Sequence, residues 1–332
     1  MFLTAFVKFV SFFISIVVAI SSIFAPITGK KFQKIQHYKD DCQASFAVIS
    51  DTHLKDNFIR LGMLEFGLID MENAKDKLDA VVFDGDITDH GYIDMWDGFA
   101  RTMAKFDIAD QTILVAGNHD TWGPDRDNIE TVKETFIKYN KEVSDRDISE
   151  MYYTTNIKGC PVIVLGSEED HTNATISQTQ IDWFAAEMEK ASKTGLPIFV
   201  FLHQSINGTH GLPYNWSKDE TDPFDEGGIG EASDDILHII EQYKNVFYIS
   251  GHIHAGFSNE KSHSYYTSVE RHDGYTLINV PCYEYPDVIR GNYPNNGTGY
   301  VFEVYENEVM LRARNFSTGR WLSRYDEVIE LV

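Results

Sequence analysis

The chain has 332 residues, of which 43% are hydrophobic and 24% are charged, a composition that excludes intrinsic disorder as its class. Its formal net charge is -23, from 51 acidic and 28 basic residues. A field of that sign repels the phosphates of nucleic acids, so no nucleic-acid partner is expected. Its three cysteines, Cys42, Cys160 and Cys282, are too widely spaced for a disulfide framework and are expected to be buried thiols.

Residues 1–29 are expected to form a unit apart from the folded domain. Residues 9–27 are almost continuously apolar and are flanked by lysines, and their length is close to the ~20 residues that span a bilayer. This favours a transmembrane anchor over the alternative, a signal peptide cleaved near Ala19 or Ser21. Both alternatives predict a membrane-anchored or secreted protein whose folded part is extracytoplasmic. Residues 30–44 are expected to be a basic linker, and residues 45–332 a single domain.

Strand and helix patterns alternate in the first part of that domain. Apolar runs predict buried strands, and apolar positions at helical spacing predict the helices between them. The order is strand 45–50, helix 58–77, strand 80–83, helix 93–106 and strand 112–116. Such β-α-β-α-β order predicts parallel strands joined by right-handed crossovers.

The remaining patterns are less regular. A polar surface helix is expected over 127–143, and further elements at 151–155, 161–165, 178–192, 196–202, 235–243 and 246–249. Beyond residue 255 the patterns indicate strands without helices, at 264–269, 275–280, 300–305 and 309–315. They predict a second, largely antiparallel sheet packed on the first.

Side chains of the metal-ligand type follow five of the predicted strands. The blocks are Asp51-x-His53, Gly85-Asp86-x-x-Asp89, Gly117-Asn118-His119-Asp120, His203 and Gly251-His252-x-His254. In an open α/β sheet the carboxyl ends of the strands form the ligand crevice, so the fold would gather these residues. Carboxylate, amide and imidazole donors suit Mn, Fe or Zn. Seven such donors exceed the needs of one tetrahedral ion, which indicates two ions that share a carboxylate.

The ordered set of blocks resembles the calcineurin-like metallophosphoesterases over residues 45–280. The resemblance implies a four-layer α/β/β/α sandwich of two packed mixed sheets flanked by helices, with two divalent ions, Mn, Fe or Zn. It implies that Asp51, His53 and His254 hold one metal, that Asn118, His203 and His252 hold the other, and that Asp86 bridges them. It also implies that His119 is the catalytic acid, oriented by Asp89. Because Asp89 stands where the purple acid phosphatases have a tyrosine, a tyrosinate-bound ferric ion is not expected.

Several residues near the blocks are expected to have lesser roles. Asp84 and Asp120 are expected to support the ligands rather than bind metal. Five of the histidines outside the blocks are expected in solvated loops: His90, His171, His210, His263 and His272. The aromatic residues of the long loop 204–233 are expected either to cover the site or to pack on their own domain.

The function that these patterns predict is hydrolysis of a phosphodiester or phosphomonoester by in-line attack of metal-bound hydroxide, without a covalent intermediate. Substrates are expected to be phosphorylated small molecules, nucleotides or lipid headgroups, and the membrane is a partner through the N-terminal segment. A binding or scaffold protein that keeps the fold without turnover is the alternative, and a metal-dependent nuclease is disfavoured by the acidic charge.

Overall fold

The computed structural model describes residues 32–123, 128–168, 173–209, 227–258, 267–284 and 297–332. Within these ranges no helix is long and apolar enough to cross a membrane. The predicted anchor, residues 9–27, lies outside them, as does most of the aromatic loop that follows His203.

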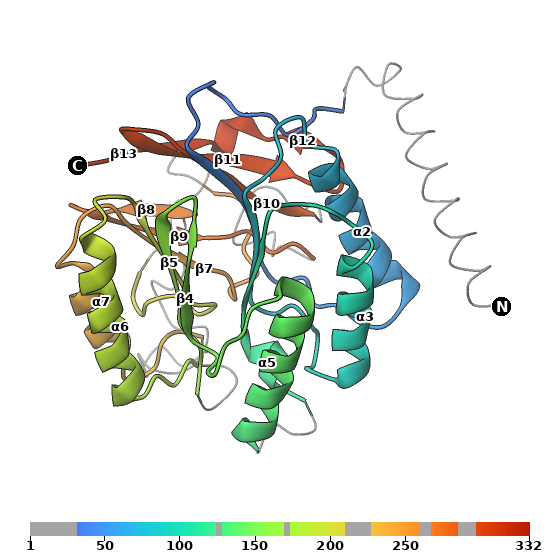
Figure 1. Ribbon diagram of the computed structural model, residues 1–332, viewed down its shortest axis with the longest axis horizontal. Coiled ribbons are helices and arrows are strands. Elements are labelled where there is room, and N and C mark those ends of the chain that lie inside the picture. The colour runs from blue at the N-terminus through green and yellow to red at the C-terminus, as the bar shows by residue number, and fades with distance from the viewer. Residues whose placement is uncertain (1–31, 124–127, 169–172, 210–226, 259–266, 285–296) are drawn as a thin grey trace.

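Two mixed sheets form the middle of the molecule (Figure 1). The first has the order β12-β11-β10-β1-β2-β3, with β13 also paired to β11. Strands β1, β2 and β3 are parallel, whereas β10 pairs antiparallel to β1 and β11 antiparallel to β10. Its strands are β1 (Ala44–Ile49), β2 (Ala80–Asp84), β3 (Thr112–Val115), β10 (Thr298–Val304), β11 (Glu308–Asn315), β12 (Arg320–Trp321) and β13 (Glu327–Glu330).

The second sheet has the order β4-β5-β6-β7-β9-β8. Its four central strands are parallel, and the two edge strands are antiparallel to their neighbours. They are β4 (Tyr153–Ile157), β5 (Cys160–Val164), β6 (Ile198–Phe201), β7 (Val246–Ser250), β8 (Val269–Arg271) and β9 (Tyr275–Asn279).

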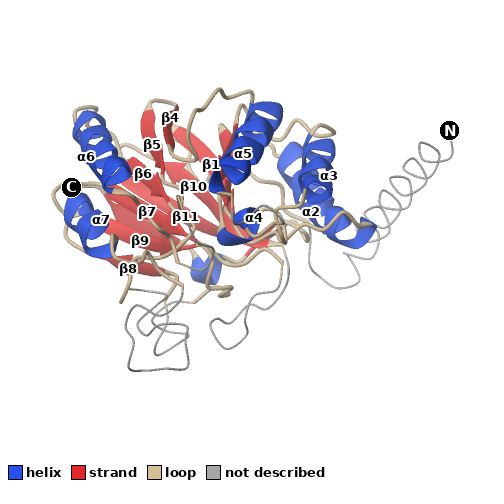
Figure 2. Ribbon diagram, turned by 90° about the horizontal axis from the view of Figure 1, so that it is seen from below, coloured by secondary structure: helices blue, strands red, loops and turns tan. Residues whose placement is uncertain are grey.

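Helices cover the outer face of each sheet, which gives the four predicted layers (Figures 1 and 2). The first sheet is covered by α2 (Phe58–Glu72), α3 (Ile93–Met103) and α5 (Ile129–Ser144), and the second by α6 (Gln178–Ser192) and α7 (Ser233–Ile240). The short α4 (Asn118–Thr121) follows β3, and a 3-10 turn, Ser323–Tyr325, precedes β13. The four-layer α/β/β/α sandwich is therefore confirmed.

The alternation of side chains along β1 shows why the central strands are apolar throughout. Phe46 and Val48 pack into the core between the two sheets, whereas Ala47 and Ile49 pack beneath the helices. Successive side chains of a strand point to opposite faces, and both faces of this sheet are covered at β1.

The predicted separate antiparallel sheet beyond residue 255 is wrong. β9 and β8 extend the parallel sheet of β5, β6 and β7, whereas β10 and β11 join the sheet of β1. Helix α5 also differs from its expectation, because Val132, Phe136 and Tyr139 form a buried stripe against the first sheet. The thiols of Cys160 and Cys282 are buried and free of disulfides, as predicted, whereas Cys42 is free but only partly buried.

Residues 32–43, here called the strap, are bound to the domain along their length. Ile35 is buried in the core beneath α2, and its carbonyl accepts from Lys75 N. Buried arginines of β11 donate to strap carbonyls, Arg314 to Gln33 O at 2.6 Å and Arg312 to Gln36 O at 2.7 Å.

Candidate metal centre

The predicted ligands follow strands of both sheets and meet where the carboxyl ends of those strands face each other. Asp51 and His53 follow β1, Asp86 follows β2, and Asn118 begins α4 after β3. His203 follows β6, and His252 and His254 follow β7 in the other sheet. The site therefore spans the two sheets instead of lying along the edge of one. Backbone hydrogen bonds tie the loops together, from Asp51 N to Gly85 O and from His53 N to Asp86 O.

Six of the seven predicted ligands gather in two groups that share Asp86. One group is Asp51, His53, Asp86 and His254, and the other is Asp86, His203 and His252; within each group the ligand atoms all lie within 4.8 Å of one another. His53 Nε2 lies 3.6 Å and His203 Nε2 lies 3.1 Å from the same atom, Asp86 Oδ2. One carboxylate oxygen thus faces a histidine from each group, which is the arrangement that a bridging ligand requires.

Asn118 lies beside these groups at the first turn of α4. Its side chain is buried, and its Oδ1 has no hydrogen-bond partner among the residues that the structure describes. The next residue anchors the turn to the bridge, because His119 N donates to Asp86 Oδ1 at 2.8 Å.

The backbone is strained where the ligands sit. Of the eight non-glycine residues found with positive φ in the described ranges, five are predicted ligands: Asp51, His53, Asp86, His252 and His254. Left-handed backbone is costly for residues with a Cβ and clusters at functional sites.

Two glycines let the loops approach the bridging carboxylate closely. Gly85 has a φ of +80°, and a Cβ there would lie 2.4 Å from His203 Nδ1. At Gly117 a Cβ would lie 2.1 Å from Asp86 N. Both contacts are far below a van der Waals separation, so only glycine fits at either position.

Burial and neighbouring charges set the protonation of the histidines. Burial lowers the pKa of His53 to about 4, against the opposing effect of Asp86 and Asp51, so its ring is neutral as a ligand must be. Burial alone would lower the pKa of His203 as well, but Asp86, Asp51 and Asp84 raise it to about 10. Without a cation, His203 therefore carries a proton that offsets the clustered carboxylates.

The residues present fit two divalent cations. The buried atoms Asp51 Oδ1 and Asn118 Oδ1 have no hydrogen-bond partner within the described part of the chain, and such orphaned acceptors are costly unless a cation meets them. His203 is oriented for ligation, since its Nδ1 bonds to Asp84 O at 2.7 Å and leaves Nε2 directed at Asp86. Oxygen and imidazole donors without thiolate suit Mn, Fe or Zn.

His119 lies beside the first group, with its ring centroid 4.6 Å from that of His53. His119 Nδ1 lies 2.7 Å from Asp89 O. A carbonyl can only accept, so Nδ1 carries the proton of this bond and Nε2 is the nitrogen left for a substrate. Asp89 therefore orients His119 through its backbone, whereas its carboxylate contacts Lys55 Nζ at 2.9 Å and His90 Nδ1 at 2.5 Å.

Comparison with known proteins agrees with this geometry. The family model of the calcineurin-like phosphoesterases matches residues 44–256, more than half of the chain. The chain belongs to the calcineurin-like phosphoesterase family. Members of this family use two metal ions, and the Asp/His groups found here could bind them.

Three proteins similar to this calcineurin-like phosphoesterase share 25% or less of its sequence. The chain is 25% identical, over 166 residues, to the "Probable glycerophosphodiester phosphodiesterase GpdQ" of Arcobacter nitrofigilis; the match covers 46% of this chain and about half, 54%, of that protein. A dimetal phosphatase from Danio rerio matches with a TM-score of 0.56 at 15% identity, covering 88% of this chain and all of that one. GAP50, the anchor in the inner membrane complex of Plasmodium, matches with a TM-score of 0.55 at 15% identity, covering 88% and 90%. The two structures show the shared fold.

The sequence did not indicate that Lys55 and His90 lie beside the site of this phosphoesterase. Both pair with the Asp89 carboxylate, and His90, which was expected in a solvated loop, has its ring centroid 6.0 Å from that of His119. No motif marks either residue; only their closeness in sequence to His53 and Asp89 could have pointed to them. Asp120 supports the ligand loops as expected, accepting from the amides of Thr88 at 2.8 Å and Gly117 at 3.0 Å.

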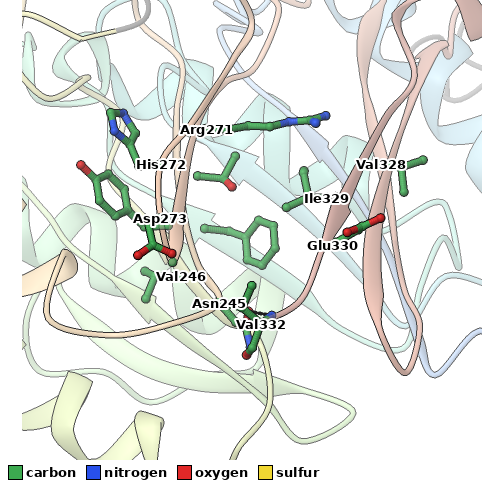
Figure 3. Close-up of a pocket in the computed structure, with 13 residues that line it drawn as sticks. Asn245, Val246, Arg271, His272, Asp273, Val328, Ile329, Glu330 and Val332 are labelled. Atoms are coloured by element: carbon green, nitrogen blue, oxygen red, sulfur yellow. Dashed lines mark hydrogen bonds between the residues drawn. The ribbon is translucent and has the colours of Figure 1, made fainter.

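A cavity of about 350 Å³ lies away from the metal centre (Figure 3). It is formed at the amino ends of β7 and β9 and by β13, with Asn245, Tyr275 and Ile329 in its wall. The ligands follow the opposite, carboxyl ends of their strands, and no predicted site residue lines this cavity.

Proposed function

We propose that this chain is an exported dimetal phosphoesterase that hydrolyses a phosphodiester or phosphomonoester of a small molecule by in-line displacement, with His119 as general acid. The observation that carries the proposal is the position of Asp86 between two ligand groups. The match to a protein named as a glycerophosphodiester phosphodiesterase supports a diester in preference to a monoester.

In this proposal Asp51, His53 and His254 hold one divalent ion and Asn118, His203 and His252 the other, with Asp86 shared. Two such ions supply Lewis-acid polarisation of the phosphoryl oxygens and a lowered pKa for attacking water. The chain contributes the strained ligand loops, which hold the donors in place before substrate arrives.

His119 supplies the proton. Its Nδ1 is engaged by Asp89 O, so Nε2 is the atom that can donate to the departing oxygen. The leaving alkoxide then departs as an alcohol, and His119 regains a proton from solvent. Lys55, 43% exposed and paired with Asp89, places a positive charge on the same side of the site.

Export is proposed from the apolar residues 9–27 alone. Protease treatment of intact cells and of lysed cells tests it. Digestion of the folded domain in intact cells is expected; protection until lysis would contradict an extracytoplasmic domain.

Hydrolysis is tested with the full-length chain in detergent. The protein is stripped of metal by chelation, and bis(p-nitrophenyl) phosphate and p-nitrophenyl phosphate are then assayed with Mn, Fe or Zn added back. Turnover restored by metal, and faster on the diester, is the expected result. A folded sample with no turnover for any metal would instead favour the non-catalytic binding protein.

A further inference from the structure

Three aromatic rings form a continuous stack beside His119. The rings of Tyr92 and His90 lie 5.9 Å apart between centroids and within 5° of parallel. His90 and Trp122 lie 5.6 Å apart at 27°. We call these three residues the aromatic shelf. The edge of the shelf meets the site, because the Trp122 and His119 centroids are 5.0 Å apart at 72°.

The loops that carry the shelf are locked together. Gly91 has a φ of +66°, and a Cβ there would lie 2.4 Å from Asp120 O, so the loop after β2 lies directly on the turn after β3. Gly91 N also donates to Thr88 Oγ1 at 2.9 Å, and His90 is held by the Asp89 carboxylate. The shelf is therefore preformed, and a ligand need not order it.

Solvent reaches both ends of the shelf. Tyr92 is 41% and Trp122 is 36% exposed, although large aromatic residues elsewhere in the described core are mostly buried. Exposed aromatic rings next to a site have faces and edges on which a planar ligand can stack.

The position of His119 relates the shelf to the chemistry. The ring of His119 contacts two other rings, that of His53 in the first ligand group and that of Trp122 in the shelf. A group that takes its proton from His119 is therefore bound next to a ring that itself contacts the shelf.

We propose that the aromatic shelf binds the base of a nucleoside leaving group, so that the preferred esters are those of a nucleoside 5′-hydroxyl. This inference rests on the proposed function. A planar base extends a stack of nearly parallel rings, whereas a glycerol or a bare sugar offers no flat face to it. The reaction is hydrolysis: water adds to phosphorus, the bond from phosphorus to the 5′-oxygen breaks, and that oxygen takes the proton of His119.

The test compares two esters with the same primary alcohol as leaving group, with and without a base. Adenosine 5′-monophosphate is paired with ribose 5-phosphate, and the methyl diesters of the two are compared in the same way. The wild-type chain is expected to favour the adenosine ester in kcat/KM by roughly tenfold or more, the scale of one stacked base.

Two variants remove shelf rings, Trp122→Leu and Tyr92→Leu, and Tyr38→Leu is the matched control. Tyr38 is 62% exposed, but it lies on the strap, where its amide donates to Glu303 at the opposite end of β1 from the ligands. Each shelf variant is expected to lower the ratio of kcat/KM for the adenosine ester to kcat/KM for the ribose ester several-fold. Tyr38→Leu is expected to leave this ratio unchanged. A wild-type ratio near one, or an equal fall for both esters, would overturn the proposal.

Calorimetric binding separates this inference from the proposed function. Binding of adenosine 5′-monophosphate and of ribose 5-phosphate is measured in the presence of Mn²⁺, whether or not either is hydrolysed. If no ester is turned over, the proposed function fails, and tighter binding of the nucleotide, lost in Trp122→Leu, still supports the shelf. Equal affinity for adenosine 5′-monophosphate and ribose 5-phosphate would overturn the proposal that the shelf binds a base.

Discussion

At the scale of single residues, the contact between His119 and Asp89 decides how the proton donor is held. The backbone carbonyl fixes the ring and its tautomer, and the carboxylate is left to Lys55 and His90. Substitution of the Asp89 side chain leaves its backbone carbonyl in place. Mutation can therefore separate orientation of His119 by the carbonyl from orientation by the carboxylate.

His119→Ala is expected to lower kcat by about 10²- to 10⁴-fold, because a positioned general acid contributes that much, while metal content is unchanged. Asp89→Asn keeps the carbonyl and is expected to cost only roughly tenfold, the lower range for a supporting residue. Steady-state kinetics and metal analysis of both variants check this. An Asp89→Asn enzyme as slow as His119→Ala would show that the carboxylate orients the ring.

His203 makes metal binding sensitive to pH. In the metal-free protein the carboxylates around it raise its pKa to about 10, so at neutral pH metal must displace a proton from Nε2. The affinity for metal is therefore expected to increase as the pH rises toward the pKa of His203, by up to roughly tenfold per pH unit. Calorimetry with Mn²⁺ in buffers of different ionisation enthalpy measures the proton release directly. Metal binding that releases no proton and does not depend on pH would contradict the raised pKa of His203.

At the scale of elements, the site depends on how closely the loops after β2 and β3 approach. Gly117 lies between β3 and α4, and a Cβ added to it would collide with the backbone nitrogen of Asp86. Backbone cannot swing aside as a flexible side chain can, so the two strand ends would have to separate.

Gly117→Ala is expected to lose metal and to lower the free energy of unfolding by about 1–3 kcal/mol, the usual cost of overpacking. Gly62→Ala is the control, because Gly62 lies in α2 with nothing within 4 Å of its Cβ position. There alanine is expected to stabilise the helix by up to about 1 kcal/mol. Denaturant unfolding and metal analysis of both variants test the contrast; full metal occupancy in Gly117→Ala would refute it.

At the scale of the whole molecule, the strap joins the beginning of the described chain to its last strands. Arg314, which donates to Gln33 O, is fully buried and pairs with Asp70 of α2. Ile35 fills the core beneath the same helix. The folded unit thus begins before residue 45, at the strap.

Ile35→Ala is expected to lower the free energy of unfolding by about 2–5 kcal/mol, as for other large-to-small changes in a core, without changing kcat. Tyr38→Ala, on the exposed side of the strap, removes a ring contact with Arg312 and is expected to lower the free energy of unfolding by at most about 1 kcal/mol. Urea titration monitored by circular dichroism compares them. Equal stability of Ile35→Ala and wild type would mean that the strap is dispensable for folding.

The family, the α/β class and the strand ends that carry the candidate ligands could all be predicted from the sequence. Short apolar runs that stop at Asp51, Asp86 and Asn118 are local signals, and their order along the chain is specific. The pairing of the strands could be seen only in the folded molecule, because hydrogen bonds between strands join residues far apart in the chain and leave no mark in local periodicity. Folding placed β10 beside β1, brought His203 to Asp86 from the other sheet, and turned the carbonyl of Asp89 toward His119. The aromatic shelf arose in the same way, since Tyr92 and Trp122 follow different strands and meet only when their loops pack together.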